Sequence, residues 1–359
     1  MRFFSLFQQN LAIDLGTANT LIIQNDVVVV NEPSIVAINR KTEETIAVGR
    51  RAMQMHEKTH DTIKTVRPLK DGVIADFRAA EHMIKGMIDM IGNRRSFFTH
   101  LKMVICIPSG ITEVEKRAVF ESAARVDSKE TYLIYEPMAA ALGIGLDVEE
   151  PVGNMIIDIG GGTTEIAVIA LSGIVCDQSI RTAGDEFTEN IASYMKRQHN
   201  ILIGERTAEK IKIAVGSALP ELDDPPPPYA VTVRALLNGI PRQITVTDQA
   251  IHTALDESIV SIEEAVIRAL ETTPPELASD IYSTGLYLTG GGALLRGLDK
   301  RLSNKTQLPV HVADDPLSAV VRGTSKALSD TGRFRAIVVP SSIVSSERYA
   351  SHDVRFRRP

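Results

Sequence analysis

Short apolar runs alternate with polar or glycine-rich turns along most of this chain. The clearest case is residues 155–170, MIIDIGGGTTEIAVIA, in which two β-rich runs flank three adjacent glycines. Such runs joined by a short glycine turn predict a β-hairpin. The glycines allow backbone amides to line a concavity that suits a phosphate, and Asp158 could hold a hydrated Mg²⁺ beside it. Taken alone, this stretch is equally typical of an ordinary hairpin with a flexible turn.

The same pattern occurs earlier, at residues 12–23, AIDLGTANTLII. A repeat of strand, aspartate, glycine, threonine and strand indicates two related halves, each with a phosphate-binding turn. Two such turns facing one another would hold the phosphates of a nucleotide and its metal from both sides. The matching positions, at one constant offset, are Asp14 with Asp158, Gly16 with Gly160, and Thr20 with Thr164.

The remaining periodicity predicts an alternation of strands and helices, which is typical of an α/β protein. Thr112 and Glu115 have the spacing of a helix capping box, and Asn25-Asp26 is a plausible turn. Further strands are expected at 27–30, 34–38, 102–107, 132–135, 229–236 and 285–288. Helices are expected at 50–57, 79–91, 113–124, 138–146, 186–199, 207–216 and 248–270, and another from Leu294.

Length and composition exclude several classes of protein. A chain of 359 residues can form two domains, and 44% hydrophobic with 23% charged residues is ordinary for a globular protein. The net charge of −6 gives no reason to expect nucleic-acid binding. Cys106 and Cys176 lie in apolar runs and are expected to be buried thiols without a disulfide. No apolar run is long enough for a transmembrane helix, and the start is too short for a signal peptide, so a cytoplasmic location is expected.

Two further groups of residues suggest chemistry. Glu136 follows the strand at 132–135 and precedes Pro137, so its carboxylate could position an attacking water; its alternative role is to complement a helix dipole. We favour catalysis, because Glu136 lies between the two phosphate turns in the sequence. Glu209 and Lys212 are spaced for a salt bridge on a solvated helix face, or they could line the base or ribose of a nucleotide. A third glycine turn, 290–292, suits the close approach of an adenosine.

Aromatic residues indicate two membrane contacts. Phe3, Phe4 and Phe7 share one face of a helical wheel at the start of the chain, which is typical of a short interfacial anchor. Phe97-Phe98 follows Arg94-Arg95 in a predicted loop, which combines aromatic residues for the interface with basic ones for anionic lipid. The alternatives are a terminal segment packed on the body or frayed, and phenylalanines inserted in the core. One such helix would bind weakly, so an oligomer would be needed.

At this point the chain resembles the actin/heat-shock chaperone/hexokinase ATPase superfamily, and within it the bacterial actins, over about residues 11–330. The resemblance implies an actin-like fold of two related RNase-H-like domains, with nucleotide in the cleft between them. It also implies paired protofilaments on the inner face of the cytoplasmic membrane, and a role in rod shape with the cell-wall elongation machinery. It rests on IDLGTANT (13–20), VRPLKDGVIADF (66–77), IPSGITEVEKRAV (107–119), EPMAAA (136–141), DIGGGTTE (158–165), AGDE (183–186), IGERTAEKIKI (203–213), TPPELASDI (273–281) and LTGGGALLRGLD (288–299).

The resemblance also implies roles for individual residues. Asp14 and Asp158 flank Mg²⁺, Glu136 orients the hydrolytic water, and Thr163 assists it. ATP is held by Gly16, Thr17, Ala18, Asn19, Gly160, Gly161, Gly162, Thr163, Gly184, Glu209, Lys212, Gly290, Gly291, Gly292 and Ala293. The family's amphipathic N-terminal helix and hydrophobic loop match Phe3, Phe4, Phe7, Phe97 and Phe98.

The expected organisation has domain I at 1–150 with a small inserted subdomain at about 33–67, and domain II at 151–315 with one at about 183–248. A helix at 316–335 is expected to return to domain I, followed by a flexible tail at 336–359. Two alternatives share the fold. A small-molecule kinase would need a further catalytic carboxylate beside a sugar pocket, and a chaperone ATPase would need a peptide-binding domain after residue 330. Tyr135, the segment 126–131 and the basic tail depart from the family pattern.

Overall fold

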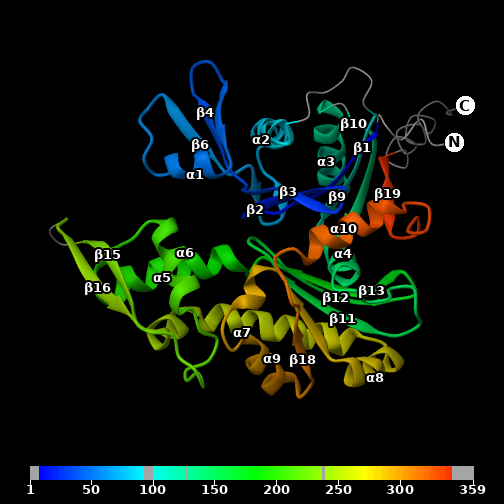
Figure 1. Ribbon diagram of the computed structural model, residues 1–359. Coiled ribbons are helices and arrows are strands. Elements are labelled where there is room, and N and C mark those ends of the chain that lie inside the picture. Colours follow the sequence, from blue (N-terminus) through cyan, green and yellow to red (C-terminus); the bar gives the residue numbers. More distant parts are fainter. Residues whose placement is uncertain (1–7, 93–99, 127, 237–238, 342–359) are drawn as a thin grey trace, which may run out of the picture. The chain divides into compact units, whose positions relative to one another are not determined.

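The chain forms two compact units (Figure 1). Unit 1 comprises residues 1–149 and 318–359, and unit 2 comprises residues 150–317. The computed structural model describes residues 8–92, 100–126, 128–236 and 239–341. The phenylalanines of the two predicted membrane contacts lie outside these described residues.

The described residues of unit 1 form a six-stranded mixed sheet. In spatial order its strands are β19 (Val338–Pro340), β10 (Ser128–Tyr135), β9 (His100–Ile107), β1 (Gln8–Leu15), β2 (Asn19–Gln24) and β3 (Val27–Pro33). Strands β1, β9 and β10 are parallel, and the others are antiparallel to their neighbours. The predicted first hairpin is confirmed as β1 and β2. The turn at Asn25-Asp26 is also confirmed, with positive φ at both residues as a tight hairpin turn requires.

Helices cover both faces of this sheet. On one face, α2 (Phe77–Met90) and α3 (Glu113–Arg125) pack on alternate residues of β1, with Met83 and Phe120 in the same cluster as Leu11 and Ile13. On the other, α10 (Ala319–Ser329) contacts β1 and β9, and α4 (Glu136–Gly143) contacts β9 and β10. The predicted capping box at the start of α3 is confirmed: the Thr112 hydroxyl accepts from the Glu115 amide, and the Glu115 carboxylate accepts from the Thr112 amide.

Helices α4 and α10 cross with their backbones in contact. A Cβ added at Gly143 would lie 1.8 Å from the carbonyl oxygen of Ala319, and one added at Gly323 would lie 1.7 Å from that of Ala139. Each helix therefore presents an alanine and a glycine four residues apart, which is the small-residue spacing that allows two helices to approach closely. No larger side chain fits at either glycine without separating the helices.

Two small sheets complete unit 1. Strands β5 (Thr45–Val48), β4 (Val36–Asn39) and β6 (Ile63–Val66) form one with α1 (Arg50–Met55) packed beside it, set to one side of the main sheet (Figure 1). Strands β7 (Leu69–Lys70) and β8 (Val73–Ile74) form the other.

The described part of unit 2 is built on a five-stranded sheet. Its spatial order is β13 (Gly173–Ile180), β12 (Thr164–Ala170), β11 (Asn154–Ile159), β17 (Leu286–Thr289) and β18 (Val310–Val312). The second predicted hairpin is confirmed as β11 and β12, and every residue of both strands is buried. Strand β17 runs parallel to β11, so the end of β11 and the end of β17 lie side by side at Asp158 and Thr289.

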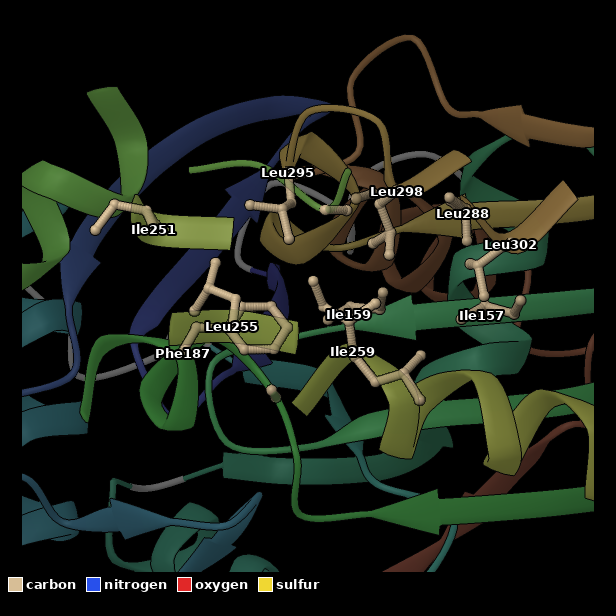
Figure 2. Close-up of a cluster of buried hydrophobic side chains, with 14 of the residues drawn as sticks. Ile157, Ile159, Phe187, Ile251, Leu255, Ile259, Leu288, Leu295, Leu298 and Leu302 are labelled. Atoms are coloured by element: carbon tan, nitrogen blue, oxygen red, sulfur yellow. The ribbon is translucent and has the colours of Figure 1, made fainter. Parts of the chain in front are cut away.

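The core of unit 2 lies between this sheet and its helices. Ile157 and Ile159 from β11 pack with Phe187 of α5 (Gly184–His199) and Leu255 of α7 (Asp248–Thr272), as Figure 2 shows. Burying a side chain of this size contributes about 1.5–3 kcal/mol. The other elements are α6 (Glu205–Val215), α8 (Pro275–Thr284), the 3₁₀ helix η2 (Gly291–Leu294) and α9 (Leu298–Thr306), with the small sheet β14 (Ile201–Leu202), β15 (Tyr229–Ala235) and β16 (Pro241–Val246).

Four sequence predictions need correction. The tail expected to be flexible from residue 336 contributes β19, which pairs with β10. The helix expected from Leu294 begins at Leu298, because Gly290 and Gly297 both have positive φ and the residues between them form η2 and a bend. The helix expected at 138–146 is α4, which begins two residues earlier and ends at Gly143. The buried thiol is confirmed for Cys106, whereas Cys176 is half-buried on β13, where its sulfur lies 3.4 Å from Oγ1 of Thr273. Neither of these two sulfurs forms a disulfide.

Candidate functional site

The glycine turn of the second hairpin is held by its carbonyl groups. The amide of Gly160 closes the turn on the Thr163 carbonyl at 2.9 Å. The Gly160 and Gly161 carbonyls accept hydrogen bonds from the first two amides of α5, those of Gly184 (3.1 Å) and Asp185 (2.7 Å). The start of α5 therefore fixes the turn by its carbonyl oxygens.

Gly184 is the point at which α5 meets this turn. A Cβ at this position would lie 3.1 Å from the Gly160 carbonyl oxygen and 3.4 Å from Nζ of Lys212. A side chain here would push the helix away from the turn. The structure thus brings Gly184, which the sequence places in the candidate site, directly against the glycines of the turn.

The first hairpin repeats this arrangement with a different partner. The Gly16 carbonyl accepts from the Ser34 hydroxyl at 2.5 Å, and the Ala18 carbonyl accepts from the Ser34 amide at 2.9 Å. The Thr17 hydroxyl accepts from the Gly72 amide at 3.0 Å. In both hairpins, protein donors therefore satisfy carbonyls of the turn. Ser34 was missed by the sequence analysis, because it follows β3 and lies outside the repeat.

Asp158 is the buried carboxylate beside the second turn, with 4% of its surface exposed. Burial raises the pKa of this carboxyl to about 6; the hydrogen bond from the Thr289 hydroxyl (2.7 Å) opposes the rise, and the charge of Glu165 adds to it. Glu165 is fully buried opposite Asp158 in the β11–β12 register, and the Ser179 hydroxyl donates to it at 2.7 Å. Two adjacent carboxylates thus lie in one buried part of the sheet, which favours a cation.

The carboxylates at this site suit Mg²⁺ better than a metal ion that is coordinated only by protein side chains. Within the described residues, no group of three or more His, Cys, Asp or Glu side chains could hold a metal. Mg²⁺ is usually bound by one or two carboxylates together with water and phosphate oxygens. Asp158, with one oxygen bonded to Thr289 and further lone pairs remaining, suits that mode of binding. Asp14 lies at the equivalent position of β1 and is half-buried.

Glu209 and Lys212 form a salt bridge on α6, which was one of the two alternatives for this pair, with 2.6 Å between Nζ and Oε2. The face is not the solvated one that this alternative expected, because the Lys212 side chain is only 15% exposed. The Lys212 ammonium also donates to the Gly184 carbonyl (2.7 Å) and the Thr188 hydroxyl (3.1 Å), so its three protons all have protein acceptors. The Thr188 hydroxyl in turn donates to Glu209 at 2.7 Å. Lys212 therefore joins α6 to the start of α5, while the side chain of Glu209 stays 44% exposed and can accept from a ligand.

The third glycine turn, at Gly290–Gly292, is packed on the end of β11. A Cβ at Gly290 would lie 2.4 Å from the Ile159 carbonyl oxygen, and one at Gly292 would lie 2.1 Å from Cγ2 of Ile159. Gly291 is exposed and Ala293 is buried. Residues 159–161 therefore connect the candidate site within unit 2. The third turn packs on Ile159, and Gly184, which accepts from Lys212, bonds to the phosphate turn.

Glu136 is the first residue of α4, with Pro137 next to it, and its side chain is half-buried. It lies in unit 1 with Asp14 and the first turn, whereas Thr163 is a buried residue of the second turn in unit 2. A carboxylate at this position can both complement the positive end of the helix and act on a nearby water.

A family model described as MreB/Mbl protein matches residues 8–336. The chain belongs to the MreB/Mbl family. It is 48% identical over 332 residues to the cell shape-determining protein MreB of Escherichia coli strain K12, which covers 91% of this chain and 95% of that protein. It is 44% identical over 330 residues to the cell shape-determining protein Mbl of Bacillus subtilis strain 168, which covers 92% and 98%.

Solved structures support the same fold for this MreB/Mbl chain. The crystal structure of MreB5 of Spiroplasma citri bound to AMPPNP superposes with a TM-score of 0.86 at 37% identity, over 91% of this chain and 97% of that one. A double helical filament of MamK matches with a TM-score of 0.76 at 20% identity, which bears on the fold alone. The predicted actin-like α/β fold is thereby confirmed. None of the described helices of this MreB/Mbl chain is both long and apolar enough to cross a membrane.

Proposed function

We propose that this MreB/Mbl chain is a bacterial actin that binds ATP with Mg²⁺, polymerises into membrane-associated filaments and hydrolyses ATP slowly. The observation that carries the proposal is the duplicated hairpin, each copy with its aspartate at a strand end and its turn carbonyls satisfied by protein donors. Relatives at 44–48% identity are named cell shape-determining proteins, and the Spiroplasma structures contain AMPPNP and ADP. We extend the determination of cell shape to this chain, and we propose that it acts in rod shape through the cell-wall elongation machinery.

In this proposal the two turns bind the phosphates through backbone amides. The phosphate ligands are Gly16, Thr17, Ala18, Asn19, Gly160, Gly161, Gly162 and Thr163. Because the Gly160 amide is already bonded to the Thr163 carbonyl, the amides that follow it in the turn would be the ones that bind an anion. Asp14 and Asp158 would hold Mg²⁺, which neutralises phosphate charge when bound.

The nucleoside part of the proposal rests on α6 and the third turn. Glu209 would accept a hydrogen bond from a ribose hydroxyl, since its side chain is half-exposed while Lys212 and Thr188 fix its orientation. Gly290–Gly292 and Ala293 would lie against the adenosine. Glu136 would orient the attacking water, with Thr163 assisting.

Asp158→Ala should weaken ATP binding in the presence of Mg²⁺ by at least about 10-fold, because the metal loses a charged ligand. Titration calorimetry with Mg²⁺ and with EDTA measures the effect. The same variant should fail to sediment as filaments with Mg²⁺ and ATP, under conditions in which the wild-type protein does.

Asp177→Ala provides the matched control, because Asp177 is an exposed carboxylate on β13 of the same unit. It should behave as the wild type in both assays. An Asp158→Ala protein that is folded and keeps its full Mg²⁺-dependent affinity would show that the metal and the phosphate turns are wrongly assigned.

We also propose that the filaments attach to the inner face of the cytoplasmic membrane through Phe3, Phe4 and Phe7 together with Phe97 and Phe98. Burying each ring contributes only about 1.5–3 kcal/mol, so one subunit gains little after ordering costs. A filament repeats these residues, and its later contacts become effectively intramolecular. Attachment therefore depends on assembly.

Deleting residues 2–7, or changing Phe97 and Phe98 to serine, should each reduce co-sedimentation with anionic lipid vesicles, and the combined variant should not co-sediment. The deletion stops at residue 7 because β1 begins at Gln8. Filaments should still form in solution. Salt should weaken attachment only in part, since it screens the arginines and not the rings. Full vesicle binding by the combined variant would place attachment elsewhere.

A further inference from the structure

Thr289 contacts the proposed metal carboxylate from a neighbouring strand. It is the last residue of β17, is fully buried, and donates its hydroxyl to Oδ1 of Asp158 at 2.7 Å. The two residues are paired in the parallel register of β11 and β17. The hydroxyl is therefore placed by the sheet itself.

A valine would fill the same volume at this position without a polar group. A buried hydroxyl is costly unless it is hydrogen-bonded, and the Thr289 hydroxyl donates to the Asp158 carboxylate. One such bond restricts rotation of the carboxylate and occupies one of about four acceptor directions. Groups that orient a metal ligand in this way typically change metal affinity by about 10–100-fold.

Thr289 is also the residue that leads into the third glycine turn. Gly290 has a φ of 78°, and its backbone lies so close to Ile159 that neither Gly290 nor Gly292 has space for a Cβ. Ile159 is the residue after Asp158. The turn and the metal carboxylate are thus joined twice, by backbone packing on Ile159 and by the Thr289 hydroxyl, so they cannot move independently.

We propose that Thr289 is a positioning residue that couples the nucleoside turn to the metal carboxylate. Through this hydroxyl, in addition to the backbone packing on Ile159, nucleoside binding and Mg²⁺ binding reinforce each other. The inference rests on the proposed function. Because coupling between two ligands is reciprocal, the change that a Thr289 substitution makes to the factor by which Mg²⁺ raises ATP affinity measures the contribution of Thr289 to the coupling.

The test measures ATP affinity of the full chain by calorimetry with Mg²⁺ and with EDTA. Thr289→Val, which keeps the shape and removes the hydroxyl, should lose about 10-fold in affinity with Mg²⁺ and nothing in EDTA. Thr289→Ser, which keeps the hydroxyl, should restore the wild-type ratio. Thr131→Val is the matched control, because Thr131 is also a buried strand threonine with a bonded hydroxyl, 2.9 Å from Oγ of Ser128.

Two calorimetric results overturn the inference. Equal losses with Mg²⁺ and with EDTA would mean that the hydroxyl only shapes the turn, and unchanged affinity would mean that it only satisfies a buried carboxylate. Asp158→Ala distinguishes these results from failure of the proposed function. If Asp158→Ala keeps the full Mg²⁺-dependent affinity for ATP, Asp158 is not a metal ligand and the proposed function itself fails. If Thr289→Val is too unstable for calorimetry, melting of the protein provides the test. The increase in the protein's melting temperature when Mg²⁺ is added to a sample that already contains ATP should be smaller for Thr289→Ala than for the wild type. An equal rise overturns the inference.

Discussion

Glu136→Gln is expected to bind ATP normally and to hydrolyse it about 10²–10⁴-fold more slowly than the wild type. The carboxylate would act on water and not on the nucleotide, so binding and chemistry should separate. Filaments of this variant should persist longer after ATP is added. Phosphate release and sedimentation, followed in the same sample, measure both effects.

The alternative role of Glu136, as a negative charge at the start of α4, predicts a different result. Charge at a helix N-terminus typically contributes about 0.3–1 kcal/mol to stability and nothing to a rate. Glu113→Gln is the matched control, because Glu113 is an acidic residue in the first turn of α3 in the same unit. Phosphate release by Glu136→Gln at the rate of the Glu113→Gln control would leave Glu136 with only the helix-terminus role.

Gly323→Ala is expected to destabilise unit 1 by about 3 kcal/mol or more, because the added Cβ would lie 1.7 Å from the Ala139 carbonyl oxygen. The clashing atom belongs to the backbone and cannot rotate away as the end of a flexible side chain can. Helices α4 and α10 must therefore move apart and lose packing contacts with each other. For a unit of this size the loss corresponds to about 6–12 °C in melting temperature. Calorimetric or circular-dichroism melting measures it.

Gly332→Ala is the control for the general cost of replacing glycine by alanine in unit 1. There the nearest atom to an added Cβ is a carboxylate oxygen of Asp330, 3.4 Å away, which is ordinary contact. This control should melt close to the wild type. A Gly323→Ala protein that does the same would show that the two helices can separate at little cost.

Local pattern was sufficient to predict the elements that carry the site. The second hairpin follows from two β-rich runs around adjacent glycines, and the start of α3 follows from the spacing of Thr112 and Glu115. The salt bridge between Glu209 and Lys212 likewise follows from their positions on one helix. Each of these depends on residues close together in the sequence, where propensity and spacing decide the outcome.

Contacts between distant residues could not be predicted in this way. Thr289 and Asp158 meet because β17 is inserted beside β11, and the sequence of β17 does not say which strand it will join. The close crossing of α4 and α10 depends on two glycines far apart in the chain. The start of α9 was misplaced for a related reason. Gly290 adopts positive φ against Ile159 and Gly297 adopts positive φ against Leu219, and local propensity does not report either contact.

The division of the chain also has a consequence for its synthesis. Unit 2 interrupts unit 1 in the sequence, so α10 and β19 leave the ribosome after all of unit 2. Chains are made at about 5–20 residues per second, so α4 waits on the order of 10 s for the helix that covers it. Unit 2 can complete its fold within that interval, whereas unit 1 cannot. The faces of β1, β9 and α4 that pack on α10 are therefore left exposed on the nascent chain until all of unit 2 has been synthesised.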